Sequence, residues 1–321
     1  MTLKLRHNTL MRLLFGGILY IGFPGLLFLL LWPLVGWCWA LVPAGLLVAL
    51  VTYGFFFGWR HIVVRSAKCV SPLLPRSFDG YRVVQLSDIH IGTFLRNRAF
   101  IDKMVRTVNA LHPDVIVFTG DLVNVSADEV IPFQHALGQL HAPDGVYSIM
   151  GNHDYCEYGA DRSDRNIARN QHVLRYLEEK IGWRLLMNEH VTIARGDGAE
   201  IAVIGVENIS RPPFPDYGDL RKAMQGLPVG MFKILLSHDP SHWRRGVLHQ
   251  TDIALTLSGH THAGQIRIGR FSPARWAYNE WGGKYEEGGS MLYVSLGIGG
   301  TVPFRFGAWP EVNVITLRCE K

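Results

Sequence analysis

The sequence predicts a membrane-embedded helical hairpin followed by a layered α/β domain. Three observations lead to this prediction. A run of 47 residues, from Leu13 to Trp59, contains no Asp, Glu, Lys, Arg or His. After this run, apolar segments of strand length alternate with helical stretches, which is typical of α/β proteins. Short polar strings follow several of these segments, at the sheet edge where α/β proteins gather their ligands.

The composition excludes several other classes of protein. The chain has 321 residues, of which 48% are hydrophobic and 18% charged, so disorder, a collagen-like repeat and a disulfide-stapled small domain are excluded. The mean hydropathy of +0.11 indicates that apolar residues are concentrated in one segment. The four cysteines are scattered and form no C-x-x-C pair, which favours free thiols in a reducing compartment.

The uncharged run is too long for one membrane crossing. One crossing takes about 20 residues, so 47 residues suit two helices, which we expect at about 10–31 and 40–59. The turn is expected at residues 32–39, where Pro33 and Gly36 loosen the helix and three tryptophans suit the headgroup level. The alternatives are a cleaved signal peptide, whose apolar region would be only about 7–15 residues, and a single signal anchor that exports the rest of the chain.

Charge placement favours the hairpin with both ends in the cytoplasm. Residues 1–78 hold seven basic side chains and no acidic one, the first being Asp79. Because Lys and Arg are retained on the cytoplasmic side, the hairpin is expected in the inner (cytoplasmic) membrane, with the domain in the cytoplasm. From Asp79 onward, the chain has 25 basic and 27 acidic residues. The basic residues that flank the membrane segment therefore cause the pI near 9.0, and stable nucleic-acid binding is not expected.

The chain is expected to divide into a transmembrane hairpin (1–60), a linker containing Pro72 and Pro75 (61–80) and one domain (81–321). The domain's apolar segments predict strands buried between layers. They are Tyr81–Ser87, Asp114–Thr119, Gly145–Met150, Glu200–Val206, Phe232–Ser237, Ile253–Ser258, Met291–Leu296 and Glu311–Leu317.

Five polar strings stand at or just beyond the ends of predicted strands. They are Ser87-Asp88-Ile89-His90, Gly120-Asp121-Leu122-Val123-Asn124, Gly151-Asn152-His153-Asp154, Ser237-His238-Asp239 and Gly259-His260-Thr261-His262. A rigid sheet can aim all five into one cleft. Their metal-binding side chains are those of Asp88, His90, Asp121, Asn152, His238, His260 and His262.

These seven side chains exceed what one transition metal needs, so they indicate two cations. An aspartate can bridge two metals about 3.5 to 4 Å apart, and such a pair activates water and clamps a phosphoryl group. Phosphoester hydrolysis is the reaction that this set fits best.

The strings D-x-H, G-D-x-x-N, G-N-H-D, S-H and G-H-x-H, in this order, resemble those of the calcineurin-like metallophosphoesterase superfamily, over about residues 81–317. The resemblance implies two packed β-sheets flanked by helices, which is a four-layer αββα sandwich, here preceded by the transmembrane hairpin. Each string alone is weak, whereas five in order are a strong signal.

The resemblance also implies a role for each residue. Asp88, His90 and His262 would hold one metal, Asn152, His238 and His260 would hold the other, and Asp121 would bridge them. His153 would face the substrate and stabilise or protonate the leaving group. The family implies manganese, iron or zinc, and imidazole and carboxylate ligands alone do not choose among these metals.

One position departs from the family pattern. Members that cleave phosphoprotein monoesters usually have Asp three residues after the bridging aspartate, and this chain has Asn124. An amide can hydrogen-bond the imidazole of His153 but does not favour its charged form. A diester or pyrophosphate, which has a better leaving group, is therefore favoured over an alkyl monoester. Arg305, in a glycine-rich segment near the end, either binds substrate phosphate or pairs with a carboxylate.

The sequence therefore predicts a membrane-anchored phosphodiesterase or pyrophosphatase, with UDP-2,3-diacylglucosamine as a candidate lipid-linked substrate by resemblance. The alternatives are a phosphodiesterase acting on a soluble nucleotide and a non-catalytic scaffold that retains the fold. The aromatic residues at 276–285 either line a substrate groove or pack in the interior, and packing is the commoner outcome. The sequence does not predict the oligomeric state.

Overall fold

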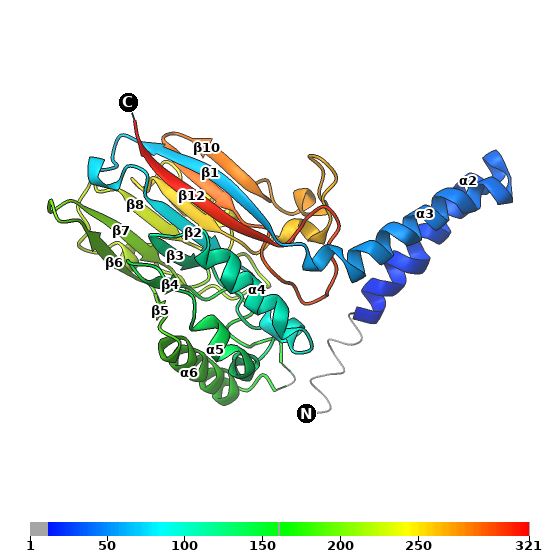
Figure 1. Ribbon diagram of the computed structural model, residues 1–321, viewed down its shortest axis with the longest axis horizontal. Coiled ribbons are helices and arrows are strands. Elements are labelled where there is room, and N and C mark those ends of the chain that lie inside the picture. Colours follow the sequence, from blue (N-terminus) through cyan, green and yellow to red (C-terminus); the bar gives the residue numbers. More distant parts are fainter. Residues whose placement is uncertain (1–11, 160, 321) are drawn as a thin grey trace.

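The computed structural model describes residues 12–159 and 161–320, and a helical hairpin projects from a two-sheet sandwich (Figure 1). The predicted start of the first helix, near residue 10, lies outside the described residues. The hairpin runs from helical residues 12–17 through a π-helical stretch, Ile18–Gly22, into α2 (Phe23–Val35) and α3 (Trp37–Phe56). Its two apolar segments, Arg12–Val35 and Trp37–Arg60, are each long enough to cross a membrane.

The turn of the hairpin is tighter than the sequence suggested. Helical structure continues on both sides through the predicted turn at 32–39, and only Gly36 interrupts it, with φ of 80°. A residue with a side chain rarely adopts this φ, so Gly36 alone makes the reversal. Pro33 stays inside α2.

Two six-stranded sheets form the sandwich. The first has the order β1 (Val63–Ser71), β12 (Glu311–Cys319), β2 (Arg82–Leu86), β3 (Val115–Phe118), β4 (Val146–Ser148) and β5 (Arg184–Leu185). The second has the order β10 (Gly283–Glu287), β11 (Ser290–Val294), β9 (Leu255–Ser258), β8 (Lys233–Leu236), β7 (Glu200–Gly205) and β6 (Glu189–Ala194). All eight predicted strand segments are strands in the structure.

The linker predicted at 61–80 is wrong over nearly half its length. Val63–Ser71 is the edge strand β1, paired in parallel with β12 from Val63–Glu311 to Ser71–Cys319. Its exposed side chains include Arg65 and Lys68, so it lacks the continuous apolar character of a buried strand. The hairpin therefore leads almost directly into the sandwich.

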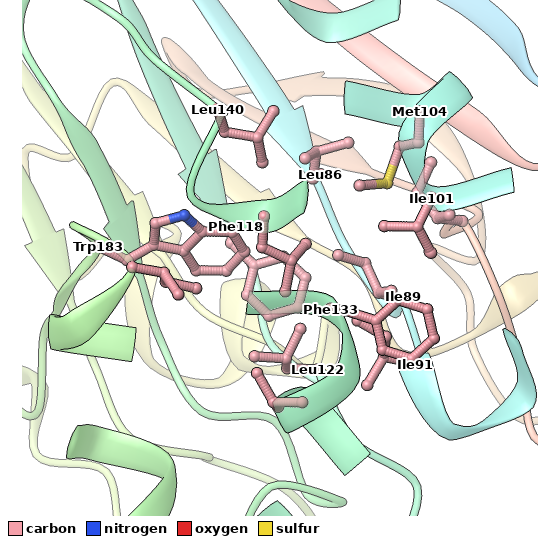
Figure 2. Packing of buried hydrophobic residues seen from close by; sticks show 14 of the residues in the cluster. Leu86, Ile89, Ile91, Ile101, Met104, Phe118, Leu122, Phe133, Leu140 and Trp183 are labelled. Atoms are coloured by element: carbon pink, nitrogen blue, oxygen red, sulfur yellow. The ribbon is translucent and has the colours of Figure 1, made fainter. Parts of the chain in front are cut away.

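Three apolar cores stabilise the sandwich, one between the two sheets and one on the outer face of each sheet. Alternate residues of the first sheet, such as Val83 and Val115, face the second sheet across a buried core. The opposite face packs under α4 (Arg98–Asn109), α5 (Gln134–Leu137) and α6 (Asp164–Lys180), as Figure 2 shows around Phe118 and Trp183. The second sheet's outer face is covered by α7 (Leu220–Ala223) and by Trp243. The four-layer αββα prediction is confirmed, although the fourth layer is thin.

Short helical turns make up most of the remaining regular structure. They are Gly58–Arg60, Arg76–Phe78, Ile91–Phe94, Ala127–Phe133, Trp243–Val247, His262–Gln265 and Pro273–Trp276.

Strand direction brings the polar strings to one edge. β2, β3, β4 and β5 are mutually parallel, and so are β7, β8, β9 and β11. Carboxyl ends of parallel strands meet at the same edge of a sheet. The strings that follow β2, β3 and β4 therefore lie at one edge of the first sheet, and those that follow β8 and β9 lie at one edge of the second.

The hairpin packs against the domain through the loop after β11. Phe304 lies under Leu19 and Val51, with its ring centroid 4.9 Å from that of Phe55. The backbone N–H of Arg305 donates to the carbonyl of Gly54 at 3.3 Å. A Cβ at Gly54 would come within 2.3 Å of the Phe304 ring, so a glycine is needed for this close approach.

Candidate active site

The structure brings six of the seven predicted metal ligands together in two overlapping groups, and the seventh, Asn152, contacts the second group. One group contains Asp88, His90, Asp121 and His262, and the other contains Asp121, His238 and His260. In each group, one ligand atom from every residue lies within 4.8 Å of the others. Asp121 belongs to both groups, which is the place that a bridging carboxylate requires.

In the first group, four ligand atoms lie close to one another. His90 Nε2 lies 3.2 Å from His262 Nε2 and 3.5 Å from Asp121 Oδ2. His262 Nε2 is 3.4 Å from Asp88 Oδ1. Imidazole nitrogens and carboxylate oxygens this close, with no hydrogen-bond geometry to explain all of the contacts, fit a cation between them.

The second group includes the amide of Asn152. Its Oδ1 lies 3.1 Å from His238 Nε2 and 2.9 Å from His260 Nδ1. The same His238 Nε2 is 3.3 Å from Asp121 Oδ2. The amide is oriented by its Nδ2, which donates to Tyr158 at 3.0 Å, so the oxygen is the atom turned to the two imidazoles.

The ligand loops have unusual backbone geometry. Positive φ values occur at Asp88, His90, Asp121, His260 and His262. Non-glycine residues rarely adopt this region, and clusters of such residues mark functional sites. The carboxylate of Asp88 also receives the backbone N–H of His260 at 3.0 Å, which joins the first and last strings directly.

Gly259 allows the Asp88 side chain to come close. A Cβ at Gly259 would lie 1.9 Å from Ser87 Oγ and 2.2 Å from Asp88 Oδ2. We expect Gly259→Ala to displace Asp88 and lower both metal content and phosphodiester turnover, the latter at least tenfold. Gly196→Ala is the matched control because nothing lies within 4 Å of its added Cβ. Metal analysis of the two purified variants tests this, and unchanged metal content in Gly259→Ala would contradict it.

Burial keeps most of the ligand imidazoles neutral. It lowers the pKa of His90 to about 3 and that of His260 to about 4, and it lowers the pKa of His262 well below its usual range. A neutral imidazole has the free lone pair that a metal needs. For His238, burial also lowers the pKa, but the attraction of Asp121 and Asp88 outweighs it and raises the pKa to about 10. This site thus attracts positive charge.

In two ligand histidines, a contact of the other ring nitrogen fixes the orientation of the imidazole. His238 Nδ1 donates to the carbonyl of Thr119 at 2.8 Å, which leaves Nε2 for the site. Such a partner on the other ring nitrogen is usual for metal-bound histidine. His260 Nε2 lies 2.7 Å from the hydroxyl of Tyr278. Tyr278 also lines the cleft, so for this residue the expectation of interior packing is wrong.

His153 stands beside the ligand groups. Its backbone N–H donates to Asp121 Oδ1 at 2.8 Å, and its Nδ1 donates to the backbone carbonyl of Asn124 at 2.8 Å. The Asn124 amide instead donates through Nδ2 to Thr93 at 3.2 Å. Position 124 thus orients His153 through its main chain, whereas the sequence suggested a side-chain contact.

Arg305 lies beneath the site and does not reach into the cleft. It is 2% exposed, and its guanidinium donates to the carbonyls of Leu296, Ala308 and Gly299. Its Nη2 also lies 3.1 Å from His262 Nδ1. The predicted phosphate contact is therefore wrong, because carbonyl oxygens already occupy the guanidinium. No carboxylate pairs with it among the described residues.

Asp154 holds the site together, a role that its residue type alone does not reveal. Its two carboxylate oxygens accept the backbone N–H groups of Gly151, Asp121, Leu122 and Val123 at 2.7 to 3.0 Å. It therefore holds the Asp121 loop against the Asn152 loop. Its place at the end of the G-N-H-D string is the signal that could have identified it.

The ligand groups open into a cleft of about 420 Å³, a size typical of small-molecule sites. His90, Asp121 and Asn152 line one part of it, and His153 lies beside them. Phe214 and the segment from Gly264 to Tyr278 line another part of it. The arrangement places metal ligands, a histidine and aromatic side chains around one open cleft.

Together the fold and the site define a metal-dependent phosphoester hydrolase. The sequence comparison agrees, since residues 81–264 match the calcineurin-like phosphoesterase family. The chain belongs to this family.

Several curated proteins are similar to the chain in sequence, and one of the three described next is named for its substrate. A metallophosphoesterase of Bacillus subtilis, YkuE, is 32% identical over 86% of this chain and 93% of its own length. A zebrafish transmembrane protein with metallophosphoesterase domain is 35% identical over 76% of this chain but only 55% of its own length. The UDP-2,3-diacylglucosamine pyrophosphatase LpxG of Chlamydia trachomatis is 26% identical over 77% of this chain and 86% of its own length.

Proposed function

We propose that this protein is a membrane-anchored phosphoesterase with two metal ions that hydrolyses a phosphodiester or pyrophosphate bond of a lipid-linked substrate. The observation that carries the proposal is the pair of ligand groups that share Asp121 at the cleft. The soluble-nucleotide and scaffold alternatives have less support, because the ligand set is complete and stands beside a membrane hairpin.

The ligand set fits a dinuclear site. Asp88, His90 and His262 would hold one ion, Asn152, His238 and His260 the other, and Asp121 would hold both. Two bound cations would supply a water nucleophile and charge neutralisation for the phosphoryl group. Mn, Fe and Zn all accept imidazole and carboxylate ligands, and we propose one of these metals.

His153 would assist the leaving group. Because Nδ1 donates to the Asn124 carbonyl, Nε2 is the ring nitrogen left for the substrate. The partner of Nδ1 is thus a neutral carbonyl, and it lacks the negative charge with which a carboxylate would assist proton donation by the imidazole. This supports a substrate whose leaving group needs little protonation, such as a diester or pyrophosphate.

The hairpin supports the membrane assignment. Both candidate spans are bordered by basic residues, and the first acidic residue is Asp79. By the positive-inside rule, the catalytic domain would face the cytoplasm at the inner membrane. A relative named UDP-2,3-diacylglucosamine pyrophosphatase makes a lipid-linked pyrophosphate the substrate class to examine first.

The proposal is tested by turnover of two chromogenic esters by the detergent-purified chain. With added Mn²⁺, we expect kcat/KM for bis(4-nitrophenyl) phosphate to exceed that for 4-nitrophenyl phosphate at least tenfold. Asn152→Ala and His262→Ala should each abolish turnover, since each removes a ligand from one metal group.

Three other outcomes would count against the proposal in different ways. Preference for the monoester would overturn the diester assignment. Absence of bound metal together with absence of turnover would favour the scaffold. Turnover of the diester without any hydrolysis of UDP-2,3-diacylglucosamine in mixed micelles would remove that lipid from consideration.

A further inference from the structure

A second hollow lies between the hairpin and the domain, away from the metal ligands. It has a volume of about 390 Å³, and its walls are almost entirely apolar. The hairpin contributes one wall through residues such as Leu26 and Leu50, and the domain contributes Ile266, Ile268, Phe304 and Phe306. We call this hollow the hairpin groove.

The hairpin groove and the catalytic cleft share a thin wall. Gln265 lines the cleft and its neighbour Ile266 lines the groove. The segment around Ile266 pairs with the segment around Phe306, because Phe306 N–H donates to the Gln265 carbonyl at 3.0 Å and Arg267 N–H donates to the Phe306 carbonyl at 2.8 Å. The two spaces are therefore adjacent at this paired segment, and a molecule that occupies both would have to pass over its edge.

The rim beside the two spaces has the composition of a membrane-contacting surface. Ile268 is 61% exposed and Trp276 is 77% exposed, while Arg270 and Arg275 are exposed between them. Tryptophan and arginine side chains suit the headgroup level. The same segment forms part of the cleft, through Pro273 and Ala274, so a membrane that contacts this surface would lie next to the cleft.

The walls indicate which occupant the hairpin groove takes. A peptide would bring backbone N–H and C=O groups that need partners, and this groove presents almost no polar surface. An acyl chain has no such groups. Since α2 and α3 also belong to the candidate membrane spans, a chain can enter from the bilayer without crossing water.

We propose that the hairpin groove binds an acyl chain of the substrate while the phosphate of the same molecule lies at the metal ligands. This inference rests on the proposed function and adds the site that selects for a lipid. It assigns the hairpin a role in substrate binding in addition to anchoring.

The test compares ethyl and octyl 4-nitrophenyl phosphate, two diesters with the same leaving group, as substrates of the full chain in detergent with Mn²⁺. We expect KM for the octyl ester to be lower than for the ethyl ester. Leu50→Trp, which fills the groove, should raise KM for the octyl ester at least fivefold relative to the ethyl ester. Leu46→Trp is the control on the same helix, because Leu46 is 61% exposed and outside the groove.

Partition of the octyl ester into detergent affects all variants alike, so the ratio of the two KM values isolates the groove. A ratio that changes equally in Leu50→Trp and Leu46→Trp would overturn the inference, although diester turnover would still support the proposed function. Absence of turnover of both esters by the wild-type chain would instead count against the proposed function itself.

A photolabel provides a readout that does not depend on turnover or on the folding of a variant. An octyl ester with a diazirine at the chain end should label the domain wall of the groove, residues 266–268 and 304–306, in the wild-type chain. Competition by unlabelled octyl ester should reduce this labelling. Labelling confined to other surfaces, as expected for an ordinary annular lipid, would contradict the inference.

Discussion

Asp121→Asn is expected to lower kcat/KM for an aryl phosphodiester at least 10³-fold, equivalent to about 4 kcal/mol of transition-state stabilisation. Asp121 is the one residue common to both ligand groups, and its Oδ2 lies 3.5 Å from His90 and 3.3 Å from His238. A neutral amide removes the negative charge that both cations need. Bound metal, measured on the purified chain, should fall from two ions to fewer than one.

Two comparison variants sharpen this expectation. His262→Ala affects only one group and should leave about one metal per chain. Asp239→Asn changes another buried carboxylate, next to the ligand His238 but outside both groups, and should keep both ions with less than a tenfold loss of activity. Equal metal loss in Asp121→Asn and His262→Ala would contradict a bridging role for Asp121.

The strands and ligand strings could be predicted from the sequence because their signals are local. Buried parallel strands have continuous apolar runs, and the structure has a strand at each of the eight predicted places. Since the strings directly follow five of these strands, strand direction places them at one edge of each sheet, and the packing of the two sheets then brings these edges together. Strand β1 was missed because an edge strand with exposed Arg65 and Lys68 lacks that apolar signal.

Roles that depend on tertiary contacts could not be predicted in the same way. Nothing near Arg305 in the sequence indicates that its guanidinium would meet backbone carbonyls from Leu296 to Ala308. Likewise, the residue type at position 124 does not reveal that its carbonyl, rather than its side chain, accepts from His153. The hairpin groove depends on how the stretch Ile18–Gly22 and α3 pack against Phe304, which no local pattern encodes.

Asp154→Asn is expected to destabilise the fold and disrupt the metal site although Asp154 belongs to neither ligand group. Oδ2 of Asp154 accepts from Asp121 and Gly151, and Oδ1 accepts from Leu122 and Val123. In asparagine, one oxygen becomes an NH₂ group that faces two backbone donors. Each buried donor left without a partner costs about 1 to 3 kcal/mol, so a loss of a few kcal/mol in stability follows.

Asp219→Asn is the matched control for this change. Asp219 also accepts a backbone N–H through its side chain, from Lys222 at 2.9 Å, but it is exposed at the start of α7. Asparagine serves equally well at such a helix start, so this variant should unfold at the wild-type temperature. Thermal unfolding and metal content measured on both variants separate the two cases. If Asp154→Asn unfolds at the wild-type temperature with both metals bound, Asp154 does not hold the Asp121 and Asn152 loops together. The aspartate at the end of the G-N-H-D string would then have another role.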